Sequence, residues 1–126
     1  MSVGHSVQVR WNDLDALGHV GHTAVLIFLE EGRDAMLALN GIDEYVVGQC
    51  SVSFRREIDA SVKTVTVQCG VRELGRSSMT TSERIVDEDG DVFVEAEFRI
   101  VLWDAERRAP RPISDSERAS LEEVRE

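Results

Sequence analysis

Long apolar runs are missing from this sequence. No stretch approaches 18 consecutive apolar residues, so we expect no membrane-spanning helix. The first residues, MSVGHSVQVRW, also lack the basic segment and apolar stretch of a signal peptide. The cytoplasm is therefore the expected location.

Cysteine is scarce as well. Cys50 and Cys69 are too few for a disulfide framework and do not have the spacing of a metal site. Both lie among strand-forming residues, and we expect them to be buried free thiols.

Positive charge is the third shortage. The chain has 14 Lys and Arg against 24 Asp and Glu, a formal net charge of −10. Binding along nucleic acid needs clustered cations, so we expect no nucleic-acid partner. A few arginines gathered at one place could still bind a phosphorylated small molecule.

The 126 residues, 42% of them hydrophobic, fit one domain over residues 1–126. Alternating apolar and polar positions predict strands, and a longer periodic segment predicts a helix that stops at Asn40–Gly41. A capping box, Ser114 with Glu117, opens a second helix in a peripheral tail over 113–126. The predicted strands are 5–11, 44–58, 61–74, 76–86 and 91–104, and the predicted central helix is 23–41.

A run of strands after one helix favours an α+β fold with an antiparallel sheet. The helix is large for about five strands, so we expect a curved sheet wrapped around it. Its apolar side should include Leu26, Leu29, Met36 and Leu37, and Gly32 should mark close packing on the sheet. An open curved sheet leaves edges, and pairing with a second copy would hide one of them, which predicts a homodimer.

The segment RWNDLDALGHVGH, residues 10–22, lies between the first strand and the central helix. The start of a helix carries unpaired N–H groups and partial positive charge, which can polarise a carbonyl. Gly18 and Gly21 allow close approach of a ligand, and Asp15 could act on that carbonyl as base or nucleophile. Two other interpretations stay open: Asp13 or Asp15 caps the helix, or these aspartates bind a metal with His19 and His22.

The segment VRWNDLDALGHVGHTAVLIFLEEGR resembles the hotdog-fold acyl-CoA thioesterases of the 4-hydroxybenzoyl-CoA thioesterase type. Weaker similarity continues through SVSFRREI, ELGRSSMTTSERIV and EAEFRIVLWD, so the resemblance covers about residues 5–113. That family's fold is a long helix wrapped by an antiparallel sheet. The positions that match the family motif are Trp11, Asp13, Asp15, Gly18, His19, Val20, Glu30 and Arg33.

The resemblance implies hydrolysis of acyl-CoA thioesters, with Asp15 as nucleophile or general base. The backbone N–H of His22, helped by the Gly18–His19 turn, would polarise the carbonyl. Asp13 would hold the loop, and Glu30 would line the partner subunit's site or face solvent. Family active sites lie at a dimer interface, and dimers often pair into tetramers. No metal and no cofactor beyond the CoA of the substrate is implied.

Two departures from the family pattern concern the acyl group. Gly21 replaces the usual Asn and is followed by His22, which could add a side chain that titrates near neutral pH. Val25 replaces a frequent aromatic residue. The residues expected to shape the acyl pocket are Val25, Phe28 and Phe54.

CoA is polyanionic, so local cations must offset the negative net charge of the protein. The arginines Arg55, Arg56, Arg72 and Arg76 and the hydroxyls of Ser77 and Ser78 are the candidates, with Arg76 and Ser77 first. The sequence leaves other readings of the function open: a thioesterase for carrier-protein-bound acyl chains, a non-catalytic acyl-binding protein on the same fold, and a metal-dependent hydrolase. The acidic surface disfavours acidic carrier proteins.

Overall fold

The computed structural model describes residues 1–126. The strands and helices predicted from the sequence are present, and a two-residue strand, β6, was not predicted. In chain order the elements are β1 (Val3–Gln8), η1 (Trp11–Asp13), α1 (His22–Leu39), β2 (Tyr45–Phe54), β3 (Thr64–Leu74), β4 (Ser78–Val86), β5 (Val92–Asp104), β6 (Ala109–Pro110) and α2 (Asp115–Glu122).

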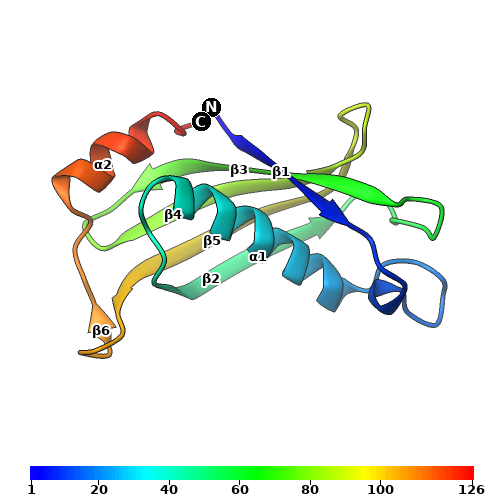
Figure 1. Cartoon of the computed structure of the whole chain (residues 1–126), viewed down its shortest axis with the longest axis horizontal. Helices are drawn as coiled ribbons and strands as arrows, with labels where there is room; N and C mark the ends of the chain where they lie inside the picture. The colour runs from blue at the N-terminus through cyan, green and yellow to red at the C-terminus, as the bar shows by residue number, and fades with distance from the viewer.

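The strands form one antiparallel sheet in the order β1-β3-β4-β5-β2, with β6 pairing to β5. Figure 1 shows α1 lying across one face of this curved sheet. The helix packs on β1, β3 and β4. The expected α+β architecture, a central helix wrapped by a curved antiparallel sheet, is confirmed. None of the helices has the length and apolar character needed to cross a membrane.

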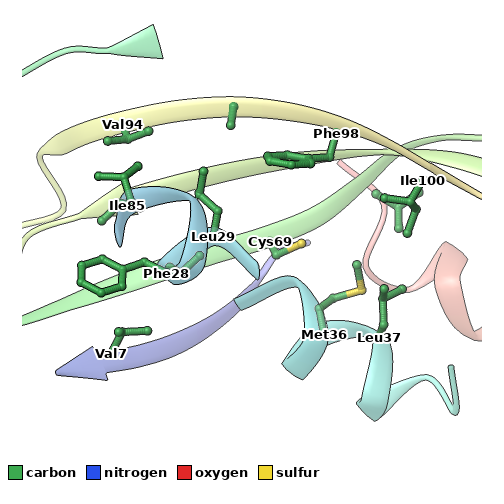
Figure 2. Packing of buried hydrophobic residues seen from close by; sticks show 14 of the residues in the cluster. Val7, Phe28, Leu29, Met36, Leu37, Cys69, Ile85, Val94, Phe98 and Ile100 are labelled. Atoms are coloured by element: carbon green, nitrogen blue, oxygen red, sulfur yellow. The ribbon is translucent and has the colours of Figure 1, made fainter. Parts of the chain in front are cut away.

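The core lies between α1 and the sheet. Phe28, Leu29, Met36 and Leu37 are fully buried, and Figure 2 shows side chains of α1 and the strands meeting in this layer. The prediction was wrong for Leu26, which is 38% exposed. Because α1 packs mainly on β1, β3 and β4 and meets β2 only at Tyr45, one flank of the helix remains uncovered.

Gly32 of α1 packs directly against Val67 of β3. A Cβ atom built on Gly32 would lie 2.3 Å from Cγ1 and 2.7 Å from Cβ of Val67. No side chain fits at that distance, so glycine is what allows the helix to approach the sheet. The close packing expected of Gly32 is confirmed.

A buried ion pair crosses the core. Arg33 of α1 and Glu83 of β4 are almost fully buried, and the Arg33 Nη1 donates to Glu83 Oε1 at 3.1 Å. The Arg33 guanidinium also lies 4.0 Å from the centre of the Phe98 ring, and its Nε donates to the Tyr45 hydroxyl at 3.1 Å. Burial raises the pKa of the Glu83 carboxyl, against the opposing effect of Arg33. The pair therefore links α1 to β4 through the core.

The edge strand β2 is paired only with β5, and its helix-side face is largely open. Val47, Val52 and Phe54 pair with buried residues of β5 and so project toward the helix side, yet Val47 is 45% and Phe54 55% exposed. Cys50 is exposed for the same reason, so its predicted burial was wrong. Cys69, on the covered strand β3, is a buried free thiol as expected.

The C-terminal segment returns to the sheet. The predicted capping box of α2 is present, since the Ser114 side chain accepts the Glu117 N–H at 3.1 Å and the Glu117 carboxylate accepts the Ser114 N–H at 2.9 Å. Leu121 is fully buried, which ties α2 to the core. The two chain ends lie side by side, with the Met1 amino group bonded to the Arg125 carbonyl.

Candidate functional site

A cavity of about 320 Å³ opens at the N-terminal end of α1. It joins the loop before α1, the first turn of that helix, the end of β2 with the residues after it, and the start of β5. Half of its lining residues are apolar, and its polar groups converge from the loop, the first turn of α1 and the residues that follow β2. The lining residues are Asp15, His19, Val20, His22, Val25, Phe54, Arg56, Glu57, Ile58 and Val94.

The loop before α1 is held by Asp13. The buried Asp13 carboxylate accepts the Arg10 backbone N–H at 2.8 Å, and the Arg10 guanidinium lies 3.3 Å from its other oxygen. Gly18 has a positive φ of 77°, which closes a turn in which its N–H donates to the Asp15 carbonyl at 3.0 Å. The loop-holding role expected of Asp13 is confirmed, and Asp13 caps the short η1 rather than α1.

The Asp15 carboxylate faces the cavity with both oxygens engaged. Oδ1 accepts the Leu17 N–H at 2.9 Å, and Oδ2 lies 3.1 Å from His19 Nε2. The side chain keeps 39% of its surface exposed. A carboxylate fixed in this way stays accessible to a ligand in the cavity.

The first turn of α1 meets the same cavity. Gly21 is the N-cap residue of α1, and no side chain accepts a hydrogen bond from the helix start. The interpretation of Asp13 or Asp15 as a cap of α1 was therefore wrong. The N–H groups of this turn remain available beside Asp15, together with the positive end of the helix dipole.

His19 lies between two carboxylates. Its Nε2 is 3.1 Å from Asp15 Oδ2, and its Nδ1 is 3.2 Å from Glu57 Oε2. The hydrogen bond with Glu57 raises the pKa of His19; desolvation opposes this, and the Asp15 charge adds to it.

Glu57 was not predicted as a site residue. In the sequence it is one charged residue among several at the end of a long strand pattern. The strand ends at Phe54, and the chain then turns toward the loop, where the Val20 N–H donates to the Ile58 carbonyl at 2.8 Å. That tertiary contact brings Glu57 to His19, and nothing in the local sequence indicates it.

Of the arginines proposed to bind CoA, Arg56 lines the cavity, whereas Arg55 and Arg72 do not. Arg56 lines the cavity and stacks 3.8 Å from the Phe93 ring centre, with an ion pair to Asp87. Arg55 is exposed and paired with Glu95, 3.0 Å away. Arg72 is likewise exposed and pairs with Glu97 at 3.0 Å.

Arg76, Ser77 and Ser78 lie far from Asp15 within one chain. Ser78 pairs with Val101, whereas the cavity residue Val94 lies seven positions earlier on β5, a separation of about 23 Å along the strand. Figure 1 shows the loop before α1 and the turn before β4 at opposite ends of the sheet. A single chain therefore does not bring these residues to the cavity.

The predicted acyl-pocket residues also separate. Val25 and Phe54 line the cavity. Phe28 does not, because it is fully buried between α1 and the sheet, one turn further along the helix. Its placement in the pocket is thus corrected. Glu30 is exposed two turns from the helix start and faces a different hollow, beside Val46 and Val47.

The alternative metal set does not assemble. Asp13, Asp15, His19 and His22 do not bring three ligand atoms within 4.8 Å of one another, whereas Asp87, Asp89 and Asp91 in the β4–β5 turn do. The Asp13 carboxylate is bonded to Arg10, and His22 makes no hydrogen bond or ion pair with Asp15 or His19.

Comparison with known proteins gives a family and a fold. The model of the thioesterase-like superfamily matches residues 9–121, which is most of the chain. None of the curated proteins matches this chain.

Among solved structures, a predicted thioesterase from Bacillus stearothermophilus is 23% identical with a TM-score of 0.89, covering 100% of this chain and 98% of that one. A thioesterase from Thermus thermophilus, solved in complex with coenzyme A and Zn, is 25% identical with a TM-score of 0.82, covering 94% and 95%. A 1,4-dihydroxy-2-naphthoyl-CoA thioesterase from Synechocystis is 13% identical with a TM-score of 0.83, covering 98% of each chain. The fold is the hotdog fold of these thioesterases.

Proposed function

The chain belongs to the thioesterase-like superfamily and is a thioester hydrolase, and we propose that its substrates are acyl-CoA thioesters, cleaved with Asp15 as the catalytic carboxylate. The observation that carries this proposal is the position of Asp15. Its carboxylate lies in a half-apolar cavity beside the uncapped start of α1. One place thus combines a group that attacks or activates water with donors for a developing oxyanion.

The reaction follows from that arrangement. The acyl chain lies against Val25 and Phe54, and the thioester carbonyl points at the first turn of α1. Asp15 attacks the carbonyl carbon, or takes a proton from the water that does so. In both routes negative charge grows on the carbonyl oxygen, and the N–H groups of the helix start stabilise it. The C–S bond then breaks, which releases the thiol and, after addition of water, the free acid.

Coenzyme A as the carrier is supported by the complex of the Thermus thermophilus relative with coenzyme A. In this chain Arg56 borders the cavity and could meet a phosphate if it left Asp87. Arg76, Ser77 and Ser78 suit a phosphate by type but lie at the other end of the sheet. We infer that a second copy of the chain brings them to the cavity.

We propose a homodimer in which β2 pairs with β2 of the partner. The strand has a free edge, and its open side carries the apolar residues Val47, Val52 and Phe54. Antiparallel pairing about a two-fold axis brings the far end of one sheet toward the near end of the other. Arg76 and Ser77 of one subunit would then serve the Asp15 cavity of the other, and two such dimers could form a tetramer.

Subunit mixing tests this sharing. Asp15→Asn and Arg76→Ala chains are each expected to be impaired, yet a mixed dimer contains one site with both Asp15 and Arg76 intact. Random mixing of equal amounts, by unfolding and refolding together, should restore about a quarter of wild-type activity. Activity no higher than the mean of the two variants would show that Arg76 does not act across an interface.

The substrate class is tested by thiol release from aromatic, short and long acyl-CoAs and from acyl chains on a carrier protein. Wild type is compared with Asp15→Asn, and Asp115→Asn, the same change on α2 and remote from the cavity, is the matched control. Faster turnover of CoA esters than of carrier-protein esters supports the proposal. The reverse order would assign the chain to carrier-protein substrates, and binding of acyl-CoA without turnover would make it an acyl-binding protein.

A further inference from the structure

The proposed hydrolysis leaves one requirement unassigned, a proton for the departing sulfur. A thiol with an ordinary pKa near 8.5 leaves as thiolate and ends protonated at neutral pH. As a nucleophile, Asp15 is bonded to the acyl carbon and has no proton to give when the C–S bond breaks. As a base, it holds the proton taken from water on a carboxyl group whose Oδ2 lies 3.1 Å from His19 Nε2. The nucleophilic route therefore needs a second group that holds a proton at neutral pH, and in the general-base route the same group can pass the proton of Asp15 to the sulfur.

His19 is placed to hold that proton. A neutral imidazole donates through one nitrogen only, whereas the imidazolium donates through both. Here the two ring nitrogens face two carboxylates, Asp15 at 3.1 Å and Glu57 at 3.2 Å. Only the protonated ring satisfies both contacts, and the raised pKa of His19 agrees with this geometry.

The surroundings of His19 favour the charged ring. It is a partly exposed side chain, with 27% of its surface accessible, and the positive groups that share its cavity are directed elsewhere. Arg56 is bound to Asp87 and stacked on Phe93. The titratable and charged groups that face His19 from the elements around it are Asp15, His22, Arg56, Glu57 and Asp59.

We propose that His19 is the acid that protonates the departing thiolate and that Glu57 is the positioning residue that keeps this proton on the ring. The proposal rests on the thioester hydrolysis proposed above. When Asp15 loses its charge, by bonding to the acyl carbon or by taking a proton from water, its hold on the Nε2 proton weakens. That proton is then free to move to sulfur as the C–S bond breaks and its electron pair goes to sulfur.

The proton balance closes in both routes. If Asp15 forms an acyl bond, neutral His19 keeps Nδ1–H on Glu57, and Nε2 takes a proton from the water that cleaves this bond. If Asp15 has taken the proton from water, it passes that proton to Nε2. In each case water supplies hydroxide to the acyl carbon and a proton to the thiol, and the imidazolium returns.

The first test follows the protonation of His19 directly, without reference to activity. The chain has 3 histidines, so proton NMR titration resolves each ring, and the His19 signal is identified by its loss in His19→Gln. Glu57→Gln should lower the pKa of His19 by about 1 unit. Glu73→Gln, an exposed carboxyl on β3 with no contact to the site, should leave it unchanged. An unaltered pKa in Glu57→Gln would overturn the proposal even if the protein proved inactive on every thioester.

The second test asks whether this proton serves the leaving group. The alkaline limb of the kcat/KM profile should move to lower pH in Glu57→Gln by the same amount as the His19 pKa. His19→Gln should slow hydrolysis of CoA esters by about 100-fold, the size of a general-acid contribution. With an ester of an acidic aromatic thiol, which leaves without protonation, the loss should fall below about 10-fold. Equal losses on both esters, or an alkaline limb that does not move, would show that His19 is only structural and overturn the proposal.

Discussion

Replacement of Gly32 by alanine sets two opposed effects against each other. Alanine is favoured over glycine inside a helix by about 1 kcal/mol, so propensity alone predicts that the variant is more stable. The added Cβ, however, would lie 2.3 Å from Cγ1 and 2.7 Å from Cβ of Val67. Ordinary carbon contacts need about 3.5–4.0 Å.

The steric effect should win. Val67 is fully buried on β3, and its own Cβ is fixed to the backbone, so a change of rotamer does not relieve the contact. The helix and the sheet must move apart by about 1 Å, and this movement disturbs the other contacts of a densely packed core. Overpacking of this kind costs about 1–3 kcal/mol and occasionally more, and two contacts this short place Gly32→Ala at the upper end. We expect a net loss of about 2 kcal/mol in the free energy of unfolding.

Urea unfolding followed by circular dichroism measures this loss. Gly4→Ala is the matched control, since a Cβ there meets Thr66 at an ordinary 3.5 Å, and it should stay within about 0.5 kcal/mol of wild type. Adding Val67→Ala to Gly32→Ala removes the closest contact, so the double variant should be more stable than the sum of the single effects. A Gly32→Ala protein as stable as wild type would refute the packing described for α1.

Three further predictions concern charges and the sheet edge. Glu83→Ala leaves Arg33 buried without its partner and should cost about 3–5 kcal/mol in urea unfolding, whereas a loss below about 1 kcal/mol would contradict the buried pair. The hydrogen bond from Arg111 lowers the pKa of Glu117 to about 2, so its stabilising effect is complete above the ordinary value near 4.5 and fades as the pH falls toward 2. Thermal unfolding at pH 5 and pH 3 should therefore show a smaller drop in Glu117→Gln than in wild type, and equal drops would argue against it. Val47→Lys should weaken the dimer in sedimentation, and a wild-type profile would exclude pairing through β2.

Much of the fold could be predicted because its signals are local. Alternation of apolar residues predicts the strands, and Asn40–Gly41 predicts the end of α1, where Gly41 has a φ of 75°. The wrong predictions of burial concern residues whose exposure depends on which other element packs over them. Cys50 and Leu26 look as apolar as their neighbours, but α1 covers only part of the sheet, and their exposure depends on which strand lies at the edge.

In the site, too, the features with a local sequence signal could be predicted and those that depend on tertiary contacts could not. Asp15 and the helix start belong to one short segment, so the sequence places them together. Glu57 reaches His19 from 38 residues away, through a turn after β2 that has no sequence signal. The prediction for Phe28 was wrong because Val25 and Phe28 lie on the same side of the helix. Phe28 is covered by the sheet, whereas Val25 lies at the end of the sheet and borders the cavity.

The most direct test of the account is the turnover of acyl-CoA by Asp15→Asn beside wild type. The substitution keeps the shape of the side chain and removes its charge, and circular dichroism together with CoA binding would establish that fold and ligand site persist. We expect kcat to fall by at least about 100-fold while CoA still binds. A folded Asp15→Asn protein that cleaves acyl-CoA at the wild-type rate would contradict the assignment of Asp15 as the catalytic carboxylate.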